Sequence, residues 1–143
     1  MKSTGLKIKT ENGSTYVYDV TRKKYLVLTP EEKVRQTIIH YLIQVLGYSL
    51  NLVRTELPTQ YHALAKRTDI LVFDKKGQPY MLIECKAADV KISNKVVEQA
   101  SRYNLSLKAP YLCVTNGSST FCFHVDFEAQ KTTQLRSMPL PEA

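Results

Sequence analysis

The sequence predicts a single domain of the mixed α/β class (α+β, with a mixed sheet), in which two helices pack on the sheet. Its 143 residues, 43% of them hydrophobic, are enough for one core. Two stretches repeat apolar residues at helical spacing, and short apolar runs are separated by Gly, Pro and Asn. We expect a hairpin extension over 1–24, a core over 25–125 in the order helix, strand, hairpin, helix, strand, and a polar tail over 126–143.

The chain up to Gly47 is predicted to form a hairpin and then a helix. Asn12-Gly13 lies between two strand-like runs and accepts the positive φ angles of a tight turn. Thr29 and Glu32 have the spacing of a capping box, and Pro30 suits the first helical position. A helix of about four turns follows, with an apolar stripe made of Val34, Ile38, Tyr41, Leu42 and Val45.

The middle of the chain is predicted to contain a strand, a loop and a second hairpin. The strand-like run is Leu50–Leu57, which ends at Pro58, and a loop over 59–66 follows. The hairpin strands are Ile70–Phe73 and Tyr80–Ile83, joined by a turn that contains Gly and Pro.

The last third is predicted to contain the second helix and two more strands. The helix runs from about Ser93 or Asn94 to Lys108, before Pro110. A crossover through this helix makes the Tyr80 strand and the strand Tyr111–Thr115 parallel. Asn116-Gly117 turns the chain into the strand Thr120–Val125, and the remainder is expected to be a loosely packed end.

Composition favours an anionic partner and excludes several classes of function. Twenty Lys and Arg against 13 Asp and Glu give a formal charge of +7. No phosphate-binding loop or nucleophile elbow is present, and Cys85, Cys113 and Cys122 lack metal-site spacing and are expected to be buried free thiols. The absence of a signal peptide or an apolar span predicts a cytoplasmic protein without a membrane partner.

Asp69, Glu84 and Lys86 form the constellation that could carry chemistry. Side chains alternate along a strand, so Glu84 and Lys86 share a face. If the hairpin closes symmetrically about Lys76-Gly77, Phe73 pairs with Tyr80, Leu71 with Leu82, and Asp69 with Glu84; a bulge would shift this register. Two adjacent carboxylates repel each other unless a cation lies between them, which predicts a Mg²⁺ site with Lys86 as a fixed positive charge beside it.

The helices add further candidates. Glu31 lies at the edge of the first helix's core-facing stripe and lacks a structural explanation, whereas capping explains Glu32. On the second helix, Gln99 and Tyr103 align with Val96 and Leu107 and are expected to point toward the sheet. An acid such as Glu56 at a strand end is equally well explained as a solvated charge.

The chain resembles the N-terminal nuclease-like domain of type I restriction enzyme R subunits, within the PD-(D/E)xK nuclease superfamily. The resemblance covers about 22–122 and rests on the motifs TRKKYLVLTPEEKVRQ, RTDILVFD, LIECKA, QASRYN and PYLCVTNG. It implies a restriction-endonuclease-like core, in which a helix is followed by an antiparallel meander, a helix and a strand, with a metal site at the splayed ends of the sheet. Thr68 replaces the proline of the superfamily name, a position that shapes the backbone and binds no metal.

The resemblance also implies roles for the candidate residues. Asp69 and Glu84 would bind the metal, Lys86 would be the catalytic lysine, and Gln99 and Tyr103 would lie beside the DNA backbone. Glu31 is the favoured helix acid, ahead of Glu32, and Glu56 is held in reserve.

The function expected is a deoxyribonuclease that uses Mg²⁺, with Mn²⁺ as a substitute. A motor or another restriction-complex subunit would act from another chain, and self-association is left open. The alternatives are a non-catalytic module that binds nucleic acid or a partner, and a basic domain whose polar constellation arose by chance. Basic side chains that could bind the DNA backbone are Lys23, Lys24, Lys66, Arg67, Lys75, Lys76, Lys91 and Lys95.

Overall fold

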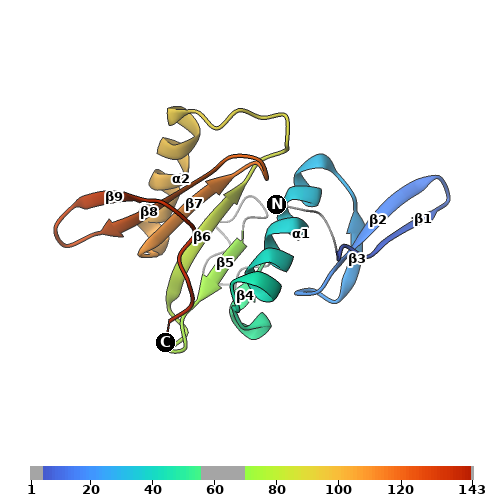
Figure 1. The fold of residues 1–143 in the computed structure, drawn as a ribbon, viewed down its shortest axis with the longest axis horizontal. Coiled ribbons are helices and arrows are strands. Elements are labelled where there is room, and N and C mark those ends of the chain that lie inside the picture. Colours follow the sequence, from blue (N-terminus) through green and yellow to red (C-terminus); the bar gives the residue numbers. More distant parts are fainter. Residues whose placement is uncertain (1–4, 56–69, 143) are drawn as a thin grey trace.

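The computed structural model describes residues 5–55 and 70–142. Its elements in chain order are β1 (Ile8–Glu11), β2 (Ser14–Asp19), β3 (Lys24–Val27), α1 (Pro30–His40), β4 (Val53–Arg54), β5 (Ile70–Phe73), β6 (Pro79–Cys85), α2 (Asn94–Leu107), β7 (Tyr111–Thr115), β8 (Thr120–Asp126) and β9 (Lys131–Leu135). The strands form a three-stranded sheet, β1-β2-β3, and a six-stranded sheet, β4-β5-β6-β7-β8-β9 (Figure 1). Within the two described ranges, no helix is long and apolar enough to cross a membrane.

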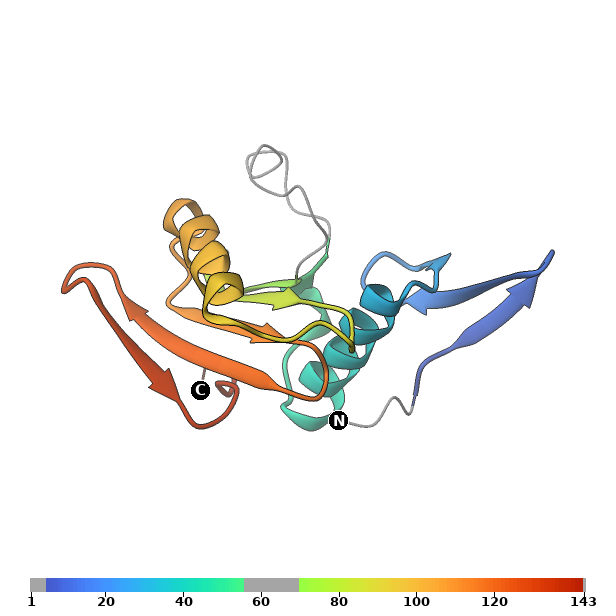
Figure 2. The same ribbon diagram turned by 90° about the horizontal axis from the view of Figure 1, so that it is seen from above.

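The six-stranded sheet is mixed and is covered by a helix on each face. β6 and β7 are parallel, as predicted, and the other neighbouring pairs are antiparallel. Because side chains alternate along β6, Ile83 and Cys85 join the core cluster on the α1 side, whereas Leu82 joins the cluster on the α2 side. Figures 1 and 2 show the two helices on opposite faces of this sheet.

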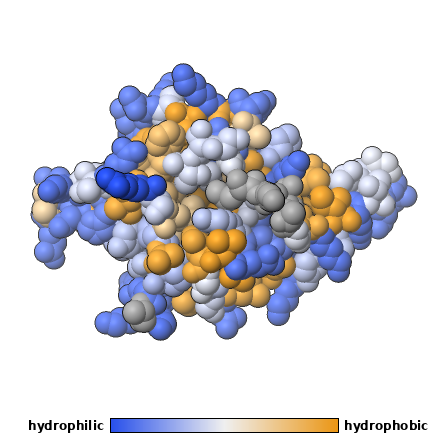
Figure 3. Space-filling view, in the orientation of Figure 1, coloured by the Kyte–Doolittle hydropathy of each residue, from blue (hydrophilic) through white to orange (hydrophobic). Residues whose placement is uncertain are grey.

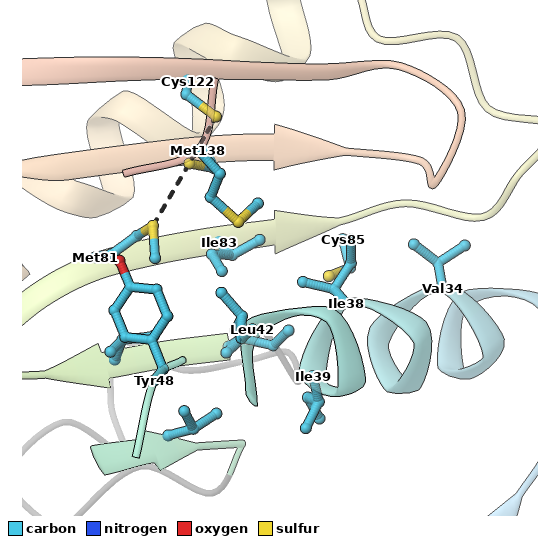
Figure 4. Packing of buried hydrophobic residues seen from close by; sticks show 14 residues of the cluster. Val34, Ile38, Ile39, Leu42, Tyr48, Met81, Ile83, Cys85, Cys122 and Met138 are labelled. Atoms are coloured by element: carbon cyan, nitrogen blue, oxygen red, sulfur yellow. Dashed lines mark hydrogen bonds between the residues drawn. The ribbon is translucent and has the colours of Figure 1, made fainter. Parts of the chain in front are cut away.

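Helix α1 begins as predicted and ends differently. The Thr29 hydroxyl accepts a 3.0 Å hydrogen bond from the Glu32 backbone N–H, and Pro30 occupies the first turn. Figure 4 shows side chains of α1, including Ile38, directed toward β6. The predicted position of Val45 in the apolar stripe is wrong: it is 65% exposed, because Tyr41–Val45 forms a π-helical turn that changes the helical phase.

Helix α2 matches its prediction. Ser93 caps its start, and Lys108 ends it in the left-handed conformation with φ at 55°. Just beyond the helix, the Asn104 side chain binds both backbone groups of Ala109: it donates to the carbonyl at 2.9 Å and accepts from the N–H at 3.0 Å. Asn104 is buried, so it replaces water for two backbone groups that the helix end would otherwise leave unpaired.

The N-terminal hairpin is confirmed and gains a strand. Asn12 and Gly13 have φ angles of 52° and 80°, as a turn with two positive angles requires. The sequence did not predict that Lys24–Val27 would continue this unit as β3, which pairs with β2.

The structure differs from the sequence prediction in two segments, the strand expected over Leu50–Leu57 and the loose tail expected over 126–143. The expected strand Leu50–Leu57 begins as the 3₁₀ turn Leu50–Leu52, and only Val53–Arg54 is a strand within the described residues; the loop over 59–66 lies outside them. The expected loose tail over 126–143 instead contains β9, which pairs with β8. Beyond β9, Met138 is buried in the core and Tyr48 donates its hydroxyl hydrogen to the Pro139 carbonyl. The tail's polar composition reflects an exposed edge strand.

The cysteines are buried free thiols, as predicted. Cys113 and Cys122 face each other across β7 and β8 with sulfur atoms 3.0 Å apart, and Met81 contacts Cys113 at 3.6 Å (Figure 4). The hydrogen bond to Cys122 and burial raise the pKa of the Cys113 thiol. Cys113 is therefore a packing residue in its protonated form at neutral pH.

Asn104→Ala should lower the free energy of unfolding by about 2–3 kcal/mol, because it leaves the buried N–H and carbonyl of Ala109 without partners. Urea denaturation measures this loss. Ser101→Ala, an exposed change on the same helix, is the control and should stay within about 0.5 kcal/mol of the original protein. Equal stability of the two variants would contradict the role of Asn104.

Candidate active site

Strand β6 places Glu84 and Lys86 at one end of the six-stranded sheet. Their shared face is confirmed: Lys86 Nζ lies 3.1 Å from Glu84 Oε2. The side chains are only 10% and 15% exposed for Glu84 and Lys86, respectively. The Lys86 backbone N–H donates to the Thr115 carbonyl at 2.8 Å, which fixes the carboxyl end of β6 against β7. The site therefore combines a shielded carboxylate and an ammonium group on a rigid strand end.

The register between β5 and β6 bears on the predicted pairing of Asp69 with Glu84. Leu71 pairs with Leu82 as predicted, and Ile70 pairs with Ile83. The predicted pairing of Phe73 with Tyr80 is wrong, because a bulge next to the turn pairs Phe73 with Pro79. Because the bulge lies between Val72 and Phe73, the pairing of β5 with β6 from Val72 back to Ile70 is the one that the sequence predicts. Asp69 and Glu56 both lie outside the described residues.

The two candidates on α2 differ in their surroundings. Tyr103 is half-buried against the α2-side core, and its hydroxyl oxygen is buried. Gln99 is exposed, so the expectation that it packs toward the sheet is wrong; Ala100, only 1% exposed, takes that position. Gln99 thus has no packing role, and Tyr103 has one.

The two acids of α1, Glu31 and Glu32, differ in burial, and the predicted capping box is not the reason. Glu31 is half-exposed and forms no ion pair with a described residue. Glu32 is buried: Arg35 donates to both of its carboxylate oxygens, at 2.7 and 3.2 Å, and Gln36 donates to it at 2.8 Å. The side chain of Glu32 does not close a capping box, because the Thr29 N–H donates to the Val27 carbonyl.

The Glu32 cluster is a buried charged group that the sequence interpretation missed. Arg35 and Gln36 follow Glu32 by three and four residues, the spacing at which side chains meet on a helix, and this spacing could have revealed it. The Oε1 atom of Gln36 is buried and has no hydrogen-bond partner within the described part of the chain.

The predicted DNA-binding cations are not equally placed. Lys75 and Lys76 lie in the β5–β6 turn, at the opposite end of β6 from Glu84, on the order of 20 Å away at the rise of a strand. Lys91 and Lys95 follow the carboxyl end of β6 and are exposed. Lys23 and Lys24 are exposed on the N-terminal sheet, and Lys66 and Arg67 lie outside the described residues.

The donor chemistry fits a hard divalent cation in part. Glu84 offers buried carboxylate oxygens, the type of ligand that Mg²⁺ prefers. Among residues 5–55 and 70–142, no three His, Cys, Asp or Glu side chains lie close enough together to hold a metal ion. Mg²⁺ can bind through one or two carboxylates and water, so a second acid near Glu84 would complete such a site.

The sequence model for the N terminus of type I restriction enzyme R proteins matches residues 30–139. The chain belongs to this family. Comparison with curated proteins gives no match. The R protein N-terminal match begins at α1 and continues through β9, so it includes both helices and the six-stranded sheet. The three-stranded sheet β1-β2-β3 precedes it.

In this R protein N-terminal domain, Arg35→Ala should cost about 3–5 kcal/mol of folding free energy, because it leaves the Glu32 carboxylate buried without its cation. The double variant Glu32→Gln/Arg35→Met removes both charges and keeps an acceptor for Gln36. It should lose less stability than Arg35→Ala alone. Denaturant unfolding of the two variants measures the difference, and a larger loss in the double variant would show that the pair's charges are not the cause.

Proposed function

We propose that this chain is a metal-dependent DNA endonuclease with a restriction-endonuclease-like core. The single observation that carries the proposal is the shielded pair of Glu84 and Lys86 on one face at the carboxyl end of β6. Membership of the R protein N-terminal family supports a role in a restriction complex. A phosphodiester is an anion, so an ammonium group held in a fixed place beside it can stabilise the charge that develops during hydrolysis.

Glu84 and Asp69 are the proposed metal ligands. Continuation of the register that pairs Ile70 with Ile83 would set Asp69 opposite Glu84, with both side chains on the face of Lys86. Bound by these acids, Mg²⁺ or Mn²⁺ would polarise the phosphate and stabilise the leaving oxygen. The bound cation would also remove the electrostatic repulsion between the two neighbouring carboxylates, so both could stay ionised.

Lys86 is the proposed catalytic residue that acts on water and phosphate. An ammonium group has three donors, and the Glu84 ion pair accounts for one of them. Another donor can hold the attacking water. A bond forms between the water oxygen and phosphorus, and the bond from phosphorus to the leaving sugar oxygen breaks. The water gives up one proton to solvent, and the leaving oxygen takes one from solvent and becomes a hydroxyl group.

The start of α2 is the proposed contact with the DNA backbone beside the site. Lys91 and Lys95 are exposed and follow the carboxyl end of β6, and Gln99 is exposed one turn further along. These side chains can donate to phosphate oxygens, which fixes the position of a duplex without reading its bases. Tyr103 would border the same surface, and Glu31 stays the proposed acid from α1. A motor subunit would act from another chain of the complex, and a homo-oligomer is left open.

Lys86→Ala and Asp69→Ala should each lower plasmid cleavage in Mg²⁺ by about 100-fold or more, because one removes a transition-state donor and the other a metal ligand. Cleavage of supercoiled plasmid in Mg²⁺, Mn²⁺ or EDTA measures this, and EDTA should abolish it. Glu31→Gln and Gln99→Ala complete the panel and should show smaller losses.

Lys131→Ala, an exposed change on β9, should cleave like the original protein and is the matched control. Thermal unfolding of each variant separates loss of chemistry from loss of fold. If the original protein binds DNA but cuts it with neither metal, the endonuclease proposal fails and the non-catalytic module takes its place.

A further inference from the structure

The three-stranded sheet has one face turned to the protein and one turned away. It extends beyond α1 to one end of the molecule (Figures 1 and 2). On the inner face, Val17 and Asp19 are fully buried. The register places Lys9 opposite Tyr16, and Tyr18 opposite Tyr25, on the other face, and Lys7 lies beside Tyr18. We name this outer surface the Lys/Tyr face; its residues are Lys7, Lys9, Tyr16, Tyr18 and Tyr25.

The tyrosine rings of the Lys/Tyr face hold the two ammonium groups in place. Lys9 Nζ lies 4.2 Å from the centroid of the Tyr25 ring and 6.0 Å from that of Tyr16. Lys7 Nζ lies 5.2 Å from the Tyr18 centroid and 5.9 Å from the Tyr25 centroid. Tyr18 and Tyr25 pack edge to face, 5.3 Å apart. Both cations therefore lie near one ring, and the cation–π contacts restrict side chains that would otherwise be free in solvent.

The positive charge of the Lys/Tyr face is only partly compensated. Glu11 pairs with Lys9 at 3.2 Å. Lys7 has no acidic partner among residues 5–55 and 70–142. Two ammonium groups that share a ring repel each other, and an anion placed between them would relieve that repulsion. In Figure 3 this end of the molecule is mostly pale to blue, with a hydrophobic area nearer α1.

We infer that the Lys/Tyr face binds the phosphate backbone of duplex DNA and anchors the substrate outside the candidate active site. The choice of DNA rests on the proposed function. Lysine ammonium and tyrosine hydroxyl groups are common phosphate donors. Restriction by the rings lowers the entropy that Lys7 and Lys9 lose on binding. Stacking of unpaired bases is a poorer match, because ammonium groups already cover the rings.

Binding of a fluorescent 20-base-pair duplex to the full chain, followed by anisotropy in EDTA at several salt concentrations, tests the inference. Lys7→Gln/Lys9→Gln should weaken binding at least about fivefold at low salt. It should also reduce the slope of log affinity against log salt by about 2, since each lost phosphate contact removes about 0.9. Lys131→Gln/Arg136→Gln removes the same charge from exposed positions at the β9 end and should leave the slope unchanged.

A gain-of-binding variant sharpens the test. Glu11→Gln removes the acid that competes for Lys9 and should tighten binding by about two- to threefold. Tyr25→Phe loses only the hydroxyl donor and keeps the ring, so it should weaken binding less than Tyr25→Leu, which also releases both lysines.

The outcomes separate this inference from the proposed nuclease. Unchanged affinity and slope in Lys7→Gln/Lys9→Gln would overturn the inference even if the protein cleaves DNA. Loss of binding in that variant would support it even if the original protein never cuts. Absence of any duplex binding at low salt would overturn it. Binding of a polyglutamate peptide in place of DNA would also overturn it and would assign the face to an acidic protein partner.

Discussion

The alternation of side chains along β6 is the constraint on which the site depends. β6 is paired on both edges and covered on both faces, so each of its residues must serve one of two layers. Met81, Ile83 and Cys85 serve the layer under α1, and Leu82 serves the layer under α2. The polar residues Glu84 and Lys86 continue the second series at the strand's end, where the apolar layer is no longer required. A shift of one residue in β6 would exchange the layers and send both charges into the α1-side core.

Local chemistry made much of the fold predictable. The Asn12-Gly13 turn, the Thr29 and Ser93 caps and the parallel pairing of β6 with β7 follow from rules that act over a few residues or from the handedness of crossovers. The errors come from interactions at longer range. Polar composition concealed β9, which takes its partner from β8, and the π-helical turn moved Val45 away from the stripe that its spacing predicts.

The part of the candidate site that depends on local rules was predictable, and the part that depends on longer-range packing was not. Glu84 and Lys86 could be paired from alternation alone, whereas the preference for Glu31 over Glu32 rested on a capping box that the Thr29 N–H does not form. Burial decides the difference between these two acids, and burial depends on what packs against α1. The described chain holds three shielded acids, each with a nearby basic group: Asp19 with Arg22, Glu32 with Arg35, and Glu84 with Lys86. Of these three acids, only Glu84 is on a strand of the six-stranded sheet. Asp19 and Arg22 reach an end of this sheet from the three-stranded sheet, because the Thr55 hydroxyl, which follows β4, donates to Asp19 at 3.3 Å and accepts from Arg22 at 2.9 Å.

The parallel contact between β6 and β7 also affects how the molecule can fold. The β5–β6 pair is local in the chain, as are β7–β8 and β8–β9, and local pairs of this kind close quickly. Joining β6 to β7 requires closure across α2, which is a slower, non-local step. Lys86 is anchored to Thr115 at that junction. A half-assembled chain therefore lacks the anchored strand end that holds Lys86 beside Glu84, so the candidate site takes its final geometry only when the two halves of the sheet have joined.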